Sequence, residues 1–199
     1  MQGRALTERE LDGTRRRLVE VATALVLEEG LEAVTLRRVA GQAGMSRSTP
    51  YTYFADKEAL IDAVRAAALH TLADRCEAAV ATCKDVAGRV AALGQTYLDF
   101  AFGHGALYDL IFEARPPTPE VQAASARYRA LTAGPLGEAE AAGLSTLPPA
   151  RLSAVLWAAT HGLVSLRRAG KVEGEAFETL LADTRSVLAF GFVPREGTP

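Results

Sequence analysis

Side chains suited to bonding phosphate groups gather in one short segment, residues 35–53. The segment holds three arginines and no aspartate or glutamate, whereas the whole chain of 199 residues carries 22 Lys+Arg against 24 Asp+Glu and a formal net charge of -2. Its hydroxyl groups, like backbone amides at helix starts, are able to bond phosphate oxygens. They belong to Thr35, Ser46, Ser48, Thr49, Tyr51 and Tyr53. A local positive field on a slightly acidic protein favours one focused anionic partner.

Arg47 lies in the middle of this segment. Its guanidinium is suited either to a bidentate contact with guanine or to a phosphate, and the sequence does not choose between them. The same residues also have an ordinary structural interpretation, in which Thr35 and Ser46 only cap helices and the arginines form a solvated face.

The remaining residue types give little support for catalysis. The three histidines, His70, His104 and His161, have no metal-binding spacing such as H-E-x-x-H, and the two cysteines, Cys76 and Cys83, do not form a C-x-x-C pair. No G-x-S-x-G motif and no phosphate-cradling glycine loop is present. We therefore predict a protein that is not an enzyme and that uses no metal and no cofactor. The sequence also contains no apolar run of the roughly 20 residues that span a bilayer and no signal-peptide core, which predicts a cytoplasmic protein without a membrane partner.

The elements that must position these side chains are predicted to be helices throughout, an all-α fold class. Alanine is abundant, β-branched runs are absent, and apolar residues recur at three- and four-residue spacing. A first helix over 13–29 has one apolar stripe and Gly30 as an αL cap. The stripe is Leu18, Val21, Ala22, Leu25 and Val26. The other helices are expected at 36–43, 46–54, 56–82, 85–102, 106–113, 119–142, 150–169 and 174–190, which makes about nine in all, with Gly134-Pro135 kinking or splitting the seventh.

The second and third of these helices have the spacing of a helix-turn-helix. Thr35 caps the first of the two, and Gly44 lies in the turn that follows it. Such a pair places its second helix in a DNA major groove while the first braces it. Pro50 leaves the start of the second helix open. With Ser46 as the cap, Pro50 falls just past the first turn, whereas a helix that starts two residues later tolerates it better.

A longer motif runs from Leu36 to Leu60. It consists of Val39-Ala40, Ala43-Gly44-Met45-Ser46, Thr49, Tyr51, Tyr53-Phe54 and Lys57-Glu58-Ala59-Leu60. With this order and spacing, residues 13–60 resemble the DNA-binding domain of the TetR family of transcriptional regulators, although Pro50 stands where that family usually has an aliphatic residue. The resemblance implies that Thr35 and Lys57 contact phosphates at the two edges of a major groove and that Phe54 packs underneath. The implied reading surface is Ser46, Arg47, Ser48, Thr49, Tyr51 and Tyr53, and Arg37 completes the predicted DNA-binding set.

The regulatory half in this family is a helical bundle that dimerises through its last two helices. Here the helices at 150–169 and 174–190 are apolar over most of their surface, which requires a partner or a lined cavity. We therefore predict a homodimer formed through these two helices. Trp157, His161 and Gly162 form a W-x-x-x-H-G pattern that resembles the C-terminal domains of a TetR subgroup named for Trp-His-Gly.

Two sets of residues are candidates for a ligand site in this half. The first is a group of aromatic side chains able to enclose an apolar cavity, and the second is the pair one turn apart in the helix at 150–169. The candidates are Tyr97, Phe100, Tyr108 and Phe112 in the first set, and Trp157 and His161 in the second. Both sets also suit an ordinary hydrophobic core, and the sequence leaves the two interpretations open.

Together these features predict two domains and a tail. Residues 1–55 form the helix-turn-helix domain, 56–191 the regulatory ligand-binding and dimerisation domain, and 192–199 a loose tail. The predicted function is a ligand-responsive regulator, most simply a repressor that a small-molecule effector releases from a pseudo-palindromic double-stranded DNA operator. The alternative is a helical ligand-binding or adaptor protein without specific DNA binding, which would leave the acid-free segment unexplained.

Overall fold

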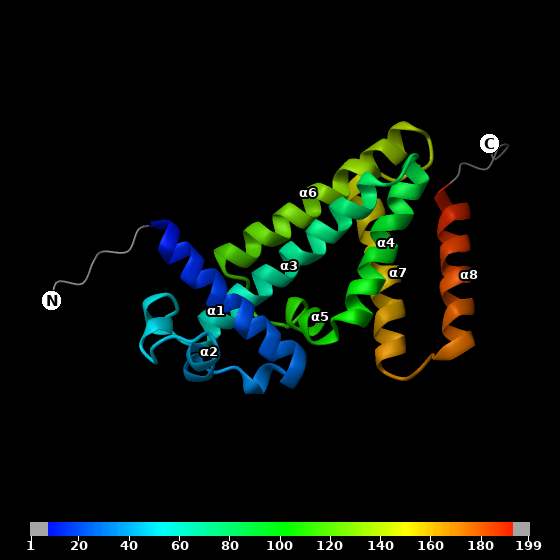
Figure 1. Ribbon diagram of the computed structural model, residues 1–199. Helices are drawn as coiled ribbons and strands as arrows, with labels where there is room; N and C mark the ends of the chain where they lie inside the picture. Colours follow the sequence, from blue (N-terminus) through cyan, green and yellow to red (C-terminus); the bar gives the residue numbers. More distant parts are fainter. Residues whose placement is uncertain (1–7, 193–199) are drawn as a thin grey trace. The chain divides into compact units, whose positions relative to one another are not determined.

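The computed structural model describes residues 8–192 and, within them, the side chains of residues 12–188. This part of the chain contains eight α-helices, two 3-10 helices and no strand (Figure 1). The elements are α1 (Glu8–Glu29), η1 (Leu31–Ala33), α2 (Leu36–Gln42), η2 (Thr49–Thr52), α3 (Lys57–Ala81), α4 (Val86–Gly103), α5 (Gly105–Ile111), α6 (Pro119–Ala141), α7 (Pro149–Arg168) and α8 (Gly174–Phe192). The predicted all-α fold is confirmed. Of the nine predicted helices, eight are α-helices, and the one predicted at 46–54 is the 3-10 helix η2.

The described residues divide into two compact units. Unit 1 contains the described residues up to His70 together with 104–125, and unit 2 contains 71–103 together with the described residues from 126 onward. Two of the three divisions fall inside α3 and α6, and the third falls between α4 and α5. They differ from the predicted functional boundary after residue 55, which stays a prediction. The predicted tail at 192–199 lies outside the described residues except for Phe192, the last residue of α8.

The core of unit 1 forms where the apolar stripe of α1 meets α2, α5 and the first half of α3. All five predicted stripe residues of α1 are buried, from Leu18 to Val26. Val39 of α2 and Leu60 and Val64 of α3 are fully buried as well. Each such side chain contributes roughly 1.5–3 kcal/mol by leaving water, so this packing fixes the positions of the short helices.

The core of unit 2 lies among α4, α7, α8 and parts of α3 and α6. Phe100 and Phe177 are its largest buried side chains. Phe177 of α8 also packs edge-on against Phe102 of α4, with ring centroids 5.6 Å apart, and the guanidinium of Arg167 lies 4.3 Å and 4.5 Å from the two centroids. Figure 1 shows α4 beside α7 and α7 beside α8. These contacts hold the last two helices to the rest of the unit.

One local expectation is wrong, and a second holds at most in one of its two forms. Gly30 does end α1, but its φ of 87° and ψ of 172° are not the αL conformation of the predicted cap, because the chain turns at once into η1. Only glycine adopts this region without strain. The second concerns Pro135, which was expected to kink or split its helix. The structure has one helix from Pro119 to Ala141 with Pro135 inside it, so no split occurs, whereas a kink stays a prediction.

None of the helices that the structure describes combines the length and the apolar character that crossing a membrane would require. Within the same residues, no three His, Cys, Asp or Glu side chains form a group that could hold a metal ion.

Candidate nucleic-acid interface and ligand pocket

The predicted DNA-binding surface begins at α2, whose start is fixed by Thr35. Thr35 is extended, and its hydroxyl accepts a hydrogen bond of 3.2 Å from the amide of Arg38, which confirms it as the N-cap. Burial of Leu36 and Val39 sets the rotation of the helix and leaves the side chain of Arg37 exposed. The side chain of Arg38 instead pairs with Glu29 at the end of α1. Arg37 is therefore the arginine of α2 that points to solvent.

Gly44 shapes the turn that follows α2. Its φ is +72°, and the amide of Met45 reaches back to the carbonyl of Ala40 at 2.9 Å. This is the hydrogen bonding of a Schellman end, in which glycine avoids the steric cost of the left-handed region. The residues of the predicted reading surface follow this turn directly in the chain.

The third element of the helix-turn-helix is one 3-10 turn, η2, rather than a helix that starts at Ser46. Ser48 occupies its N-cap position and Pro50 lies in its first turn, where the missing N–H costs nothing. The prediction of Ser46 as the cap is therefore wrong, and the alternative start two residues later is confirmed. The hydroxyl of Ser46 instead lies 3.0 Å from that of Ser48 and 2.8 Å from that of Thr49.

The predicted reading residues differ in exposure. Arg47, Ser48 and Tyr51 are exposed, and Tyr51 has 61% of its surface accessible. Thr49 and Tyr53 are half-buried. Beneath them Phe54 is buried, with the guanidinium of Arg15 at 5.2 Å from its ring centroid. The exposed arginine and tyrosine of this segment are available to a partner.

The start of α3 completes this surface. Asp56 caps the helix, since its carboxylate accepts a hydrogen bond of 2.8 Å from the amide of Ala59. The next residue, Lys57, is half-buried and begins the helix. The structure thus places all nine predicted DNA-binding residues in unit 1, between the start of α2 and the start of α3. Their contacts with DNA stay a prediction.

Buried charges hold the first half of α3 in unit 1. The guanidinium of Arg65 donates to the carbonyl of Ile111 at 3.0 Å and lies 3.4 Å from the carbonyls of Glu113 and Arg115. Arg115 in turn pairs with Glu58 at 2.8 Å and lies 3.7 Å from the buried Asp62. Sequence reasoning missed this network, because the partners of Arg65 are backbone carbonyls some 46 to 50 residues away.

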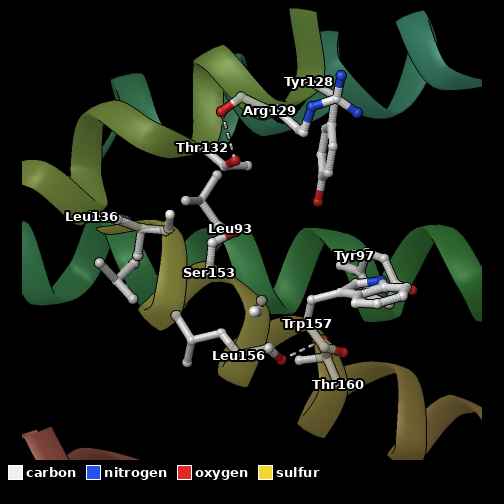
Figure 2. A pocket seen from close by; sticks show the side chains of 14 residues that line it. Leu93, Tyr97, Tyr128, Arg129, Thr132, Leu136, Ser153, Leu156, Trp157 and Thr160 are labelled. Carbon is white, nitrogen blue, oxygen red and sulfur yellow. Dashed lines mark hydrogen bonds between the residues drawn. The ribbon is translucent and has the colours of Figure 1, made fainter. Parts of the chain in front are cut away.

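Unit 2 contains a pocket of about 420 Å³ between α4, α6 and α7 (Figure 2). Its volume falls in the usual range for small-molecule sites, and its walls are mainly apolar and aromatic. The lining residues are Val90, Leu93, Gly94, Tyr97, Tyr128, Arg129, Thr132, Leu136, Ala150, Ser153, Ala154, Leu156, Trp157 and Thr160.

Three of the hydroxyl groups in the pocket have partners within the protein. The hydroxyl of Tyr97 lies 3.2 Å from Nδ1 of His161. Thr132 donates to the carbonyl of Arg129 at 3.0 Å, and Thr160 to that of Leu156 at 2.8 Å. Burial, together with the nearby Cys76 thiol, raises the pKa of Tyr128 above its usual range. Tyr128 therefore stays a neutral phenol at physiological pH.

The structure does not bring the six predicted ligand residues into one cavity. Tyr97 and Trp157 line the pocket. His161 is not among the lining residues. Its ring is hydrogen-bonded to the hydroxyl of Tyr97, and its ring centroid lies 5.4 Å from that of Trp157. Phe100 is fully buried core. Tyr108 and Phe112 belong to unit 1, where their ring centroids are 4.8 Å apart.

Sequence reasoning missed the contribution of α6 to the pocket. Tyr128, Thr132 and Leu136 follow one another at four-residue spacing, which places them on one face of the helix. This periodicity was visible in the sequence. It did not reveal that the face lines a cavity, since the same pattern describes an ordinary buried stripe.

Comparisons with known proteins agree with both halves of this description. The family described as "Bacterial regulatory proteins, tetR family" matches residues 18–64, and "Tetracyclin repressor-like, C-terminal domain" matches residues 90–184. No protein of curated function matches the sequence.

Many solved structures share the fold. A protein of unknown function from Rhodococcus sp. RHA1 is 28% identical, with a TM-score of 0.79 over 91% of this chain and 96% of that one. A TetR family transcription regulator from Marinobacter aquaeolei VT8 is 22% identical, with a TM-score of 0.68 over 95% of this chain and 100% of that one. The regulator FadR from Bacillus subtilis, in complex with stearoyl-CoA, is 16% identical, with a TM-score of 0.68 over 89% and 98% of the two chains.

Proposed function

Because the chain belongs to the tetR family of bacterial regulatory proteins, we propose that it is a homodimeric repressor that a small molecule releases from its operator. The observation that carries the proposal is the exposed, acid-free surface from Thr35 to Tyr53, which is continued by Lys57. Its arginines, hydroxyls and helix-start amides match a phosphate backbone, and Arg37, Arg47 and Tyr51 are exposed and suited to base or phosphate contacts.

The proposed dimer forms through α7 and α8. Both helices expose large apolar side chains, namely Val155 and Leu166 on α7 and Val187 on α8, the last with 70% of its surface accessible. Val155 and Leu166 are eleven residues apart, so they lie on one face of α7, and Gly162 lies between them on that face. A second copy would cover this face. Two reading surfaces would then contact half-sites about 34–36 Å apart on the DNA.

The proposed release mechanism uses α3. Arg127 of α6 pairs with Asp74 at 2.7 Å and with Glu77 at 3.1 Å, so the pocket residues on α6 are tied to the second half of α3. The same helix begins at Lys57, beside the reading turn. A ligand that prefers one setting of α6 would therefore bias the setting of α3, by no more than its differential affinity for the two states. FadR, which shares the fold, was solved with a small molecule bound, and this supports an effector role for the pocket.

The test is fluorescence anisotropy of labelled DNA from just upstream of the protein's own coding region, against scrambled DNA, at about 50 and about 200 mM salt. We expect tighter binding to the native DNA and a steep loss of affinity with salt. Lys57→Ala should lower the slope of log affinity against log salt by about 1, because one phosphate contact is lost. The matched control is Lys84→Ala, an exposed lysine in unit 2, which should leave the slope unchanged.

Two outcomes would contradict the proposal. Absence of binding to either DNA at low salt would favour a helical adaptor without a DNA partner. A salt slope that falls equally in Lys57→Ala and Lys84→Ala would mean that the basic surface around η2 is not the DNA contact.

The dimer is tested separately by sedimentation of Leu166→Glu, with Ala130→Glu on the exposed surface of α6 as its control. We expect only Leu166→Glu to shift the protein toward monomer, because it places a charge in the proposed apolar interface. A dimer of unchanged stability in Leu166→Glu would rule out this face.

A further inference from the structure

The lining of the pocket in unit 2 restricts what can bind there. None of its lining residues is an aspartate or glutamate, so an ammonium group would lose its water without gaining a carboxylate partner. Three aromatic rings, those of Tyr97, Tyr128 and Trp157, contribute flat apolar surface, and Leu93, Leu136 and Leu156 line the pocket as well. This composition favours an aromatic ligand without a positive charge.

The polar side chains that line the pocket include the hydroxyls of Tyr97, Tyr128, Thr132, Ser153 and Thr160 and the guanidinium of Arg129. The hydroxyls of Tyr97, Thr132 and Thr160 all have partners within unit 2. Figure 2 shows the hydroxyl of Tyr128 directed from α6 into the pocket, and among the described residues it has no hydrogen-bond partner. A phenol surrounded by mainly apolar walls gains most from a ligand that brings an acceptor to it.

The protonation state of Tyr128 agrees with a donor role. Burial raises the pKa of its phenol, so the proton stays on the hydroxyl throughout the physiological range. A neutral phenol donates a hydrogen bond to a carbonyl, ether or carboxylate oxygen, whereas it has no such interaction with a hydrocarbon.

We propose that the effector pocket binds a planar aromatic molecule that carries an acceptor oxygen, which the hydroxyl of Tyr128 bonds while Trp157 and the leucines contact the ring. The proposal rests on the assignment of this pocket to the effector. It goes beyond that assignment by naming the ligand class and the residue that selects it. A two-ring ligand fits the volume of about 420 Å³.

Trp157 supplies a direct readout, because it is the single tryptophan of the chain and lines the pocket. Its fluorescence is titrated with two naphthalenes of similar shape, 2-acetylnaphthalene, which has an acceptor carbonyl, and 2-ethylnaphthalene, which has none. We expect both to quench Trp157 saturably, with the ketone binding roughly three- to tenfold more tightly, the value of one ordinary hydrogen bond. A third probe, 2-naphthylmethylammonium, should bind more weakly than either.

Two matched variants test which residue causes the preference for the ketone. Tyr128→Phe keeps the ring and removes the donor, so it should abolish the preference for the ketone and leave the affinity for 2-ethylnaphthalene within about twofold. Tyr97→Phe removes a hydroxyl that already bonds His161, so it should keep the preference.

Three results would overturn the proposal. These are no saturable quenching by either naphthalene, equal affinity of the wild-type protein for ketone and hydrocarbon, and a preference that Tyr97→Phe removes while Tyr128→Phe retains it. DNA binding is measured on the same preparations without ligand. A failure of the pocket proposal with intact DNA binding is thus distinct from a failure of the regulatory function.

Discussion

Replacement of Arg65 by methionine should lower the free energy of unfolding strongly while changing the shape of the side chain little. Arg65 is only 7% exposed, and its guanidinium donates a hydrogen bond to the carbonyl of Ile111. Ile111 is the last residue of α5, so its carbonyl has no hydrogen-bond partner within that helix. Arg65→Met keeps most of the aliphatic stem and removes the guanidinium. We therefore attribute the effect of this substitution to the lost hydrogen bonds and not to a large cavity.

The magnitude follows from the geometry. The bond to Ile111 at 3.0 Å has ordinary length, and a hydrogen bond from a charged donor contributes about 1.5–3 kcal/mol. The contacts at 3.4 Å to Glu113 and Arg115 are long and add less. Among the described residues Nε of Arg65 has no partner, so part of the desolvation cost is recovered when the group is removed. The net loss should be about 2–4 kcal/mol.

The assay is urea unfolding followed by circular dichroism at one fixed protein concentration, because dimerisation makes stability depend on concentration. With a slope of about 1–3 kcal/mol per molar urea, the midpoint of Arg65→Met should fall by about 0.7 M or more. The control is Arg17→Met, whose side chain is 57% exposed and pairs with Glu20 at 3.6 Å, and which should cost about 0.5 kcal/mol or less. Equal midpoints for the two variants would refute the assigned role of Arg65.

Three further predictions concern single groups. Asp56→Ala should cost about 1 kcal/mol, because the amide of Ala59 loses its capping carboxylate, and Asp56→Asn in the same urea titration should restore most of it. Gly44→Ala should cost about 1–2 kcal/mol through its φ of +72° alone, because no atom lies within 4 Å of an added Cβ; a midpoint unchanged from wild type would contradict this. Burial raises the pKa of the Cys76 thiol to about 11 from its ordinary 9.0. The neutral thiol therefore contributes fully to the free energy of unfolding below pH 9, and this contribution is lost as the pH rises toward 11, because the thiol of the unfolded chain ionises first. Cys76→Ala should therefore lose less stability than wild type between pH 8 and pH 10.5 in thermal unfolding, and parallel losses would refute the shift.

The sequence by itself determined the features that depend on neighbouring residues. The apolar stripe of α1, the N-cap Thr35 and the glycine turn at Gly44 all act within one or two turns of the chain, so spacing and residue type sufficed to predict them. The acid-free segment and its motif also predicted the TetR family, which the comparisons confirm.

Local signals were insufficient where two local preferences competed. Ser46 is a good capping residue, but Pro50 fits the first turn of a helix that starts later, and the structure follows the proline. Pro135 breaks isolated helices, yet α6 continues through it, with Pro135 and Leu136 both buried. In both places the packing of the unit decided between conformations that the sequence permits.

Only the tertiary structure decided which side chains meet. Tyr128 and Trp157 line one pocket because α4, α6 and α7 each contribute to its walls, whereas Phe100, an equally plausible aromatic candidate, is buried in the core. Arg65 is buried because α3 lies against the end of α5, where carbonyls distant in sequence accept its protons. A helical sequence specifies which residues share a face, but a face acquires its partner only when another helix packs on it, and that choice depends on contacts across the whole unit.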